Sequence, residues 1–107
     1  MISEATMNRI RKFTSDREWE PYHTPENLAK SISIEAGELL ECFQWDAESF
    51  DAENVKDELA DVLVYCLQMA EALELDVDDI IMRKMAKNEK KYPVEKAKGN
   101  SVKYDKL

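Results

Sequence analysis

The chain has 107 residues, of which 44% are hydrophobic and 36% are charged. This length is enough for one domain with a modest core, and the composition favours a globular protein over a disordered one. No apolar run reaches the roughly 18 residues that a membrane helix requires, and the N-terminal segment lacks the apolar stretch of a signal peptide. Cys42 and Cys66 are isolated in the sequence, so we expect reduced core side chains in a cytoplasmic protein.

The net charge of −8 is unevenly distributed: residues 1–82 carry −14 and residues 83–107 carry +6. A strongly acidic body argues against a nucleic acid polymer as the partner. The basic C-terminal part has two interpretations. Its lysines either only solvate a helix and a tail, which is the simpler explanation, or provide a positive patch for an anionic substrate.

Only two Gly and three Pro interrupt the chain, and apolar residues recur at helical spacing, so the sequence predicts an all-α fold without strands. The first helix is predicted at 4–17, followed by a loop at 19–24. Thr24 as cap and Pro25 at the first helical position begin a second helix that runs to about Phe43.

The remaining elements follow a loop at 44–49. Ser49 or Asp51 is expected to cap a third helix that runs to about Leu75. Asp76 can cap a fourth helix, which Tyr92-Pro93 ends because the residue before proline is disfavoured in the helical region. Residues 94–107 are expected to be a polar, Lys-rich tail of a single 1–107 domain.

Four carboxylates are arranged as two pairs, Glu35 with Glu38 and Glu58 with Asp61, and the members of each pair are three residues apart. In a helix, residues three apart lie on one face. Two such helices packed together bring four negative charges to one place, which is costly unless a cation lies between them. Hard divalent cations prefer oxygen ligands, and Mg²⁺ is common where phosphate is transferred.

The helical register supports a metal at this place. Glu35 falls inside the apolar stripe of its helix, and burying an unpaired carboxylate costs several kcal/mol. The third predicted helix has an apolar stripe of its own, and its flank carries Glu58, Asp61 and Tyr65. The predicted members of that stripe are Val55, Leu59, Val62, Cys66, Met69 and Leu73. His23 is the only histidine, so zinc and di-iron sites of the usual kind are excluded, and Mg²⁺ remains, with Mn²⁺ as a substitute.

The spacing Glu35-x-x-Glu38, nineteen residues, Glu58-x-x-Asp61 resembles the MazG-like all-α nucleoside triphosphate pyrophosphohydrolases, and most of all their dCTP pyrophosphatase type. The segments 35–45, 57–65 and 84–93 extend this resemblance, which covers about residues 13–107. It implies a four-helix MazG-like bundle that assembles as a homodimer or homotetramer, often with the site shared between subunits.

The resemblance also implies roles for individual residues. The four acids would hold Mg²⁺, and water would attack the α-phosphorus of a dNTP to give the monophosphate and pyrophosphate, removing dCTP or modified nucleotides from the pool. We favour Glu38 over Glu35 as the carboxylate that handles the water. The residues expected to contact the nucleotide are Trp19, His23, Trp45, Tyr65, Lys84, Asn88 and Lys91.

Several alternatives stay open on the sequence alone. Trp19 and Trp45 can stack on the base or simply pack in a core or interface, and His23 can instead structure its loop. Gly37 either allows another backbone to approach or is merely tolerated. The enzyme can prefer dUTP or accept NTPs broadly, and the chain can also be a non-catalytic helical oligomerisation or nucleotide-sensing module.

Overall fold

A computed structural model describes residues 2–107 of the chain. Within this range the protein is all α, without a strand, as predicted. The residues form two compact units, one that ends at Leu75 and one that spans Asp76–Leu107. No helix among these residues is long and apolar enough to cross a membrane.

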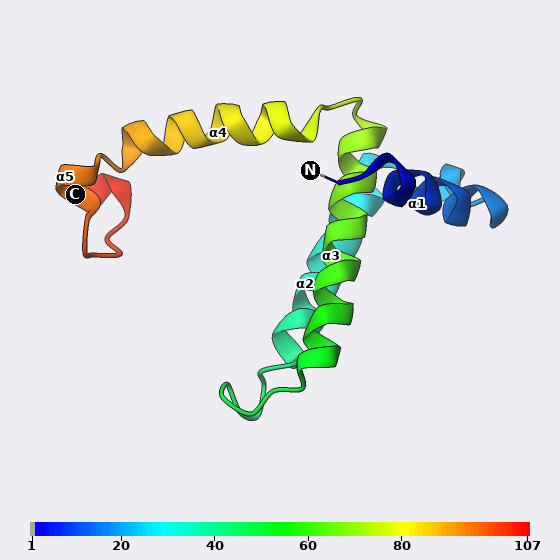
Figure 1. Ribbon diagram of the computed structural model, residues 1–107, viewed down its shortest axis with the longest axis horizontal. Helices are drawn as coiled ribbons and strands as arrows, with labels where there is room; N and C mark the ends of the chain where they lie inside the picture. Colours follow the sequence, from blue (N-terminus) through cyan, green and yellow to red (C-terminus); the bar gives the residue numbers. More distant parts are fainter. Residues whose placement is uncertain (1) are drawn as a thin grey trace. The chain divides into compact units, whose positions relative to one another are not determined.

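The first unit contains the helices α1 (Glu4–Asp16), α2 (Pro25–Glu41) and α3 (Ala52–Ala72), with a 3₁₀ turn, η1 (Glu20–Tyr22), in the predicted loop before α2 (Figure 1). Side-chain caps explain where the helices begin. The Thr24 hydroxyl accepts a hydrogen bond from the Asn27 amide, and the Asp51 carboxylate accepts from the amides of Glu53 and Asn54. Asp51, not Ser49, is therefore the cap of α3.

Two helices of this unit end in the same way, with a non-glycine residue in the left-handed region. Glu18 follows α1 and Glu74 follows α3, each with φ of 55°. The amide of the next residue then reaches back five positions, from Trp19 to the Thr14 carbonyl at 3.1 Å and from Leu75 to the Ala70 carbonyl at 2.8 Å. This is the Schellman pattern, and it fixes the direction in which the chain leaves each helix.

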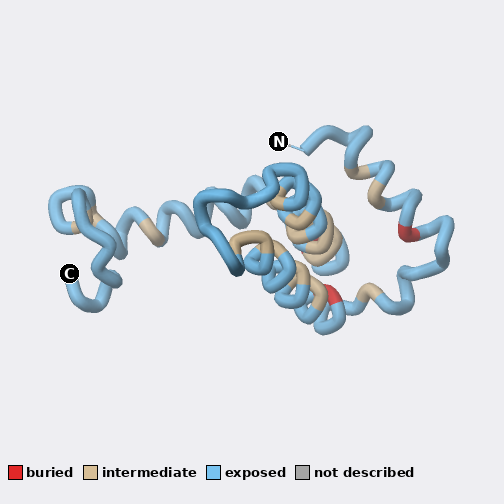
Figure 2. Tube along the Cα trace, turned by 90° about the horizontal axis from the view of Figure 1, so that it is seen from below, coloured by how far each residue is buried: buried red, intermediate tan, exposed pale blue. Residues whose placement is uncertain are grey.

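Helices α2 and α3 lie side by side and bury their facing sides, while most of the remaining surface is exposed (Figure 2). Leu28 on α2 is 1% exposed and is the most deeply buried large side chain described. The predicted stripe of α3 is partly wrong, because Leu59, Cys66 and Leu73 are exposed. The face toward α2 is instead rotated toward Glu58 and Tyr65, which are partly buried.

The two cysteines are free thiols, but the prediction that both lie in the core is wrong. Cys42 is partly buried beyond the end of α2, and Cys66 lies on the exposed side of α3. Leu59 and Leu73, seven residues before and after Cys66, are exposed as well.

The second unit begins with α4 (Val77–Lys91), which Asp76 caps and the Tyr92-Pro93 pair ends, both as predicted. After residue 93, where a polar, Lys-rich tail was expected, the structure has the short helix α5 (Val94–Ala97) and the 3₁₀ turn η2 (Tyr104–Lys106). Tyr104 folds back within this unit: its ring lies 6.1 Å from the Tyr92 ring, and the Lys91 ammonium lies 4.7 Å above it. Aromatic and cation–π contacts therefore order the segment despite its many lysines.

Gly37 lies in the middle of α2, and an added Cβ there would meet no atom within 4 Å in residues 2–107. Alanine has the higher helix propensity, so Gly37→Ala should raise the free energy of unfolding by about 0.5–1 kcal/mol. Chemical denaturation measures this change. A loss of stability would instead indicate that another chain approaches the backbone at Gly37.

Candidate active site

Three of the four predicted acids converge between α2 and α3. Glu35 and Glu38 on α2 and Glu58 on α3 each offer a carboxylate oxygen, and these oxygens lie within 4.8 Å of one another. The spacing of three residues places Glu35 and Glu38 on adjacent positions of one face, and the close packing of α2 on α3 brings Glu58 to them.

Burial and the neighbouring negative charges disfavour the ionised forms of Glu35 and Glu58 in this cluster. The Oε2 atoms of Glu35 and Glu58 are buried and lack a hydrogen-bond partner in the described part of the chain. The pKa of Glu35 is raised to about 7, first by a hydrogen bond with the Glu38 carboxyl, then by burial and by the charges of Glu38, Asp61 and Glu58. The pKa of Glu58 is raised as well, mainly by burial and then by Glu38. Glu35 and Glu58 therefore lose their protons less readily than ordinary glutamates do, and a cation bound beside them would favour the loss.

The residues present fit a divalent metal ion. The ligand atoms are all carboxylate oxygens, which hard cations prefer, and two of them are buried without a partner. A polar atom in that condition costs free energy unless something binds it. The cluster is thus consistent with a divalent cation, and its donor set contains neither the nitrogen nor the sulfur ligands typical of zinc.

Asp61, the fourth predicted acid, is not part of the three-carboxylate cluster, although it is near enough to raise the pKa of Glu35 and of Glu58. It lines a neighbouring cleft of about 560 Å³ between α1 and α3, together with Trp19 and Tyr65. A cleft of this volume is large enough for a small-molecule ligand. Asp61 is therefore placed between the acid cluster and this cleft.

Aromatic side chains line the cleft. The Trp19 ring meets the Phe13 ring edge to face, with centroids 5.7 Å apart, and the His23 ring 6.4 Å away. His23 in turn lies 6.4 Å from the ring of Tyr65, which is one turn beyond Asp61 on α3. Three of the predicted nucleotide contacts, Trp19, His23 and Tyr65, are thus brought together, and Phe13 joins them.

Trp45 lies apart from this group. It belongs to the loop that joins α2 to α3, and that loop lies at the end of the helix pair away from α1 (Figure 1). Its side chain is 89% exposed. The loop itself is ordered locally, because Phe43 and Phe50 pack with ring centroids 4.9 Å apart and the Asp46 carboxylate accepts the Glu48 and Ser49 amides.

The predicted phosphate contacts Lys84, Asn88 and Lys91 all lie on α4, in the second unit. Lys84 and Lys91 are exposed and Asn88 is partly buried. The Asn88 carbonyl accepts the Tyr92 amide at the helix end, and the Lys91 ammonium rests over Tyr104.

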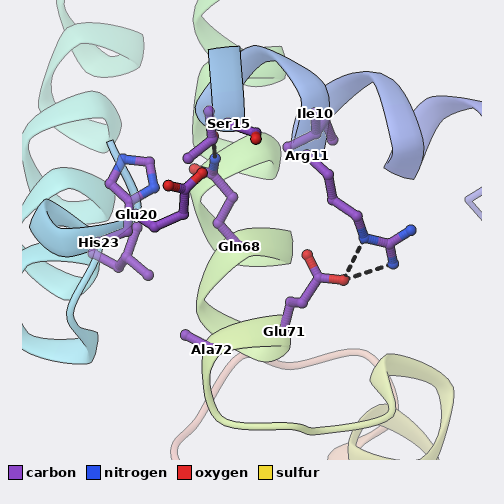
Figure 3. Close-up of a pocket in the computed structure, with 10 residues that line it drawn as sticks. Ile10, Arg11, Ser15, Glu20, His23, Gln68, Glu71 and Ala72 are labelled. Atoms are coloured by element: carbon purple, nitrogen blue, oxygen red, sulfur yellow. Dashed lines mark hydrogen bonds and ion pairs between the residues drawn. The ribbon is translucent and has the colours of Figure 1, made fainter. Parts of the chain in front are cut away.

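Sequence reasoning missed the polar contacts that join α1 to α3. The Gln68 amide donates to the Thr14 hydroxyl at 2.9 Å, and Arg11 pairs with Glu71 at 2.6 Å (Figure 3). Gln68 and Tyr65 are three residues apart, so its place beside the cleft follows from the same spacing argument as the acids. The partner on α1 lies 54 positions away, and no local pattern indicates it.

Residues 30–107 match the MazG-like family. The chain belongs to the MazG-like family. This MazG-like chain is 32% identical to dCTP pyrophosphatase 1 of Bos taurus over 98% of its own length and 70% of the relative. It is also 32% identical to dCTP pyrophosphatase 1 of Homo sapiens, over 97% of its own length and 69% of the relative. A crystal structure of a pyrophosphatase from Archaeoglobus fulgidus superposes with a TM-score of 0.74 at 42% identity, covering 84% of this chain and 91% of that one.

Proposed function

We propose that this protein is a Mg²⁺-dependent nucleoside triphosphate pyrophosphohydrolase that converts dCTP or a modified nucleotide to its monophosphate and pyrophosphate. Membership of the MazG-like family and the similarity to named pyrophosphatases support the reaction. The names of the mammalian relatives support dCTP as the substrate. Clearing unwanted nucleotides from the cytoplasmic pool is the role that fits such a reaction.

One observation carries the proposal: the convergence of Glu35, Glu38 and Glu58, with two buried oxygens that lack partners, beside a cleft lined by Asp61 and aromatic rings. A cluster of carboxylates by itself repels a triphosphate. A divalent cation held by the cluster would bind phosphate oxygens directly, and the aromatic rings alongside provide faces on which a base can stack.

The chain's own groups have distinct tasks in this mechanism. Glu35, Glu38, Glu58 and Asp61 would hold Mg²⁺, which when bound offsets phosphate charge and makes a coordinated water more acidic. Glu38 orients the attacking water and accepts its proton. Glu35, whose pKa is raised to about 7, is the poorer ligand until its proton leaves.

The remaining predicted residues bind the nucleotide. Trp19 stacks on the base, with His23 and Tyr65 beside it, and Tyr65 contacts the sugar or phosphate. Lys84, Asn88 and Lys91 on α4 meet the phosphates and sugar, where ammonium groups balance the negative charge that remains after metal binding. We further propose that the protein is a homodimer or homotetramer, since exposed apolar residues such as Leu63 on α3, 50% exposed, need a cover.

Trp45, whose side chain is 89% exposed, is also proposed to stack on the base, and its substitution tests this contact separately from Trp19. Trp45→Ala should weaken dCTP binding about 5-fold or more, because stacking on a base is worth about 1–3 kcal/mol. Mg²⁺ affinity should change little. Isothermal titration of each ligand measures both effects, and unchanged dCTP affinity would count against base stacking by Trp45.

The reaction itself is tested by incubating the protein with a panel of dNTPs and NTPs in Mg²⁺ and in water enriched in oxygen-18. Attack on the α-phosphorus predicts pyrophosphate as product and heavy oxygen in the monophosphate, read by mass spectrometry. Heavy oxygen in pyrophosphate would place the attack on the β-phosphorus instead. If the protein hydrolyses none of these nucleotides, the proposal that it is a nucleoside triphosphate pyrophosphohydrolase is refuted.

A further inference from the structure

A side-chain hydrogen bond links α3 to the end of α1 beside the cleft. The Gln68 Nε2 group donates to the Thr14 hydroxyl at 2.9 Å, and Thr14 is the buried polar residue of α1. The other half of the carboxamide, Oε1, is buried and finds no partner among residues 2–107. The bond to Thr14 is therefore the contact that fixes this amide, and it is partly buried.

Thr14 is also the residue on which the turn leading to Trp19 is built. Its carbonyl accepts the Trp19 amide at 3.1 Å, and the Ser15 carbonyl accepts the Glu18 amide at 3.0 Å. These two bonds close the Schellman turn in which Glu18 takes a φ of 55°. Whatever holds Thr14 therefore holds the backbone of Trp19 as well.

A second pair follows one turn earlier on α1. Arg11 on α1 donates to the Glu71 carboxylate on α3 at 2.6 Å (Figure 3). With the Gln68–Thr14 bond, this makes two side-chain contacts between the helices. Arg11 and Glu71 are each 42% exposed, and exposed ion pairs contribute little. The more buried Gln68–Thr14 pair is thus the stronger constraint on the end of α1.

Gln68 lines the cleft that contains Trp19, Tyr65 and Asp61, and it also lines a second cavity, of about 400 Å³, on which Thr14 and His23 border. The carboxamide therefore stands between the two spaces. Trp19 is 40% exposed, and its ring contacts are edge contacts with Phe13 and His23, which restrain a ring only weakly.

We propose that Gln68 is a positioning residue, which acts through Thr14 to hold Trp19 at the mouth of the cleft in the orientation that receives the base. The kinetic consequence rests on the proposed nucleotide hydrolysis. The placement of Trp19 does not, and it is measured without any nucleotide.

The test compares Gln68→Met, which keeps the length of the side chain, with Thr14→Val, which replaces only the hydroxyl. Trp45→Phe in both variants and in the reference leaves Trp19 as the sole tryptophan. The Trp19 emission maximum and the near-ultraviolet circular dichroism of the folded, nucleotide-free protein should shift in both variants. Thr14→Ser, which retains the hydroxyl, should restore the reference spectrum.

Kinetics with native Trp45 provide the second measurement. Both variants should raise the KM for dCTP about 5-fold or more and leave kcat within about 2-fold, because a misplaced stacking surface weakens substrate and transition state alike. Thr14→Ser should keep the KM of the unaltered enzyme. If the unaltered protein hydrolyses no nucleotide, the proposed function fails while the spectra still decide the position of Trp19.

Unchanged Trp19 spectra in both variants would overturn the proposal. A lower melting temperature with an unchanged spectrum would overturn it too, because the bond would then serve stability alone. Should Gln68→Met fail to fold, Thr14→Val and its Ser rescue decide the matter, since they alter a single group. A fall in kcat at constant KM would also contradict a positioning role.

Discussion

Glu38→Gln and Asp61→Asn should each lower kcat/KM for dCTP at least about 100-fold and leave the helical content unchanged. Glu38→Gln removes the proposed proton acceptor, which typically costs a factor of about 10²–10⁴ in rate, and Asp61→Asn removes a charged group proposed to hold the cation. Glu38 belongs to the three-carboxylate cluster and Asp61 faces the cleft, so these substitutions probe the two parts of the site separately. Steady-state kinetics and far-ultraviolet circular dichroism give the result.

Two acidic residues on the same helices provide matched controls. Glu41 is three residues beyond Glu38, and Asp57 is four residues before Asp61, and both are exposed. Glu41→Gln and Asp57→Asn remove the same charge and should change kcat/KM less than about 3-fold, as expected for solvated surface charges.

A loss of helical structure in the Glu38 or Asp61 variants would favour a structural role for these acids. Without metal we expect no such loss from Glu38→Gln, because a neutral glutamine removes the repulsion that Glu38 exerts on Glu35 and Glu58. The Glu38 variant should therefore be as stable as the unaltered protein, or more stable, when Mg²⁺ is absent.

The sequence predicted helix starts well and the burial of α3 poorly, for physical reasons that differ. The start of α2 is set by Thr24 and Pro25, and the start of α4 by Asp76. These residues act within one turn of the helix, so the local sequence is enough to predict them. Burial depends on what packs against the helix. Apolar periodicity alone placed Leu59 and Cys66 in the core, whereas the packing of α2 selects the adjacent face.

The sequence did not predict the ordered contacts of the C-terminal segment, because its composition favours a solvated chain whereas its contacts favour a folded one. Many lysines predicted a solvated tail, yet Tyr104 folds back onto Tyr92 and Lys91. Contacts of this kind join residues a dozen positions apart, and neither helical nor strand periodicity indicates them.

In the site, the sequence predicted the convergence of Glu35, Glu38 and Glu58 because spacing on two helices determines which faces the acids share. It also grouped Trp45 with Trp19, His23 and Tyr65, which lie side by side, whereas the loop that carries Trp45 lies at the other end of the helix pair. Loop residues carry no periodic signal, so their place depends on how each loop folds.

The stability of the metal-free protein should fall as pH rises from about 5 to about 7.5, and Mg²⁺ should reverse this trend. Glu35 has a pKa of about 7 in the folded protein against an ordinary value of 4.5, so the folded state binds the proton more tightly than the unfolded chain does. Its stabilising contribution is complete below the unfolded value and is lost as pH rises through the folded one. The raised pKa of Glu58 adds in the same direction.

Thermal unfolding at a series of pH values, in the presence of a chelator and then of Mg²⁺, measures this dependence. Glu35→Gln removes the titrating group and should flatten the metal-free profile between pH of about 5 and about 7.5. A profile equally steep in Glu35→Gln would assign the trend to the net charge of −8 instead.

Mg²⁺ binding should likewise be coupled to the loss of protons from the carboxyl groups. The ligand carboxylates must lose their protons to coordinate a cation, so Mg²⁺ affinity should rise with pH up to about 7 and level off above it. Calorimetric titration in two buffers of different ionisation enthalpy counts the protons released. Glu35 should release close to one proton per Mg²⁺ at pH of about 6 and about half a proton near pH 7, and the release should fall in Glu35→Gln. Binding without proton release would mean that Glu35 is ionised before the metal arrives, and the repulsion within the cluster would then have to be relieved by another charge.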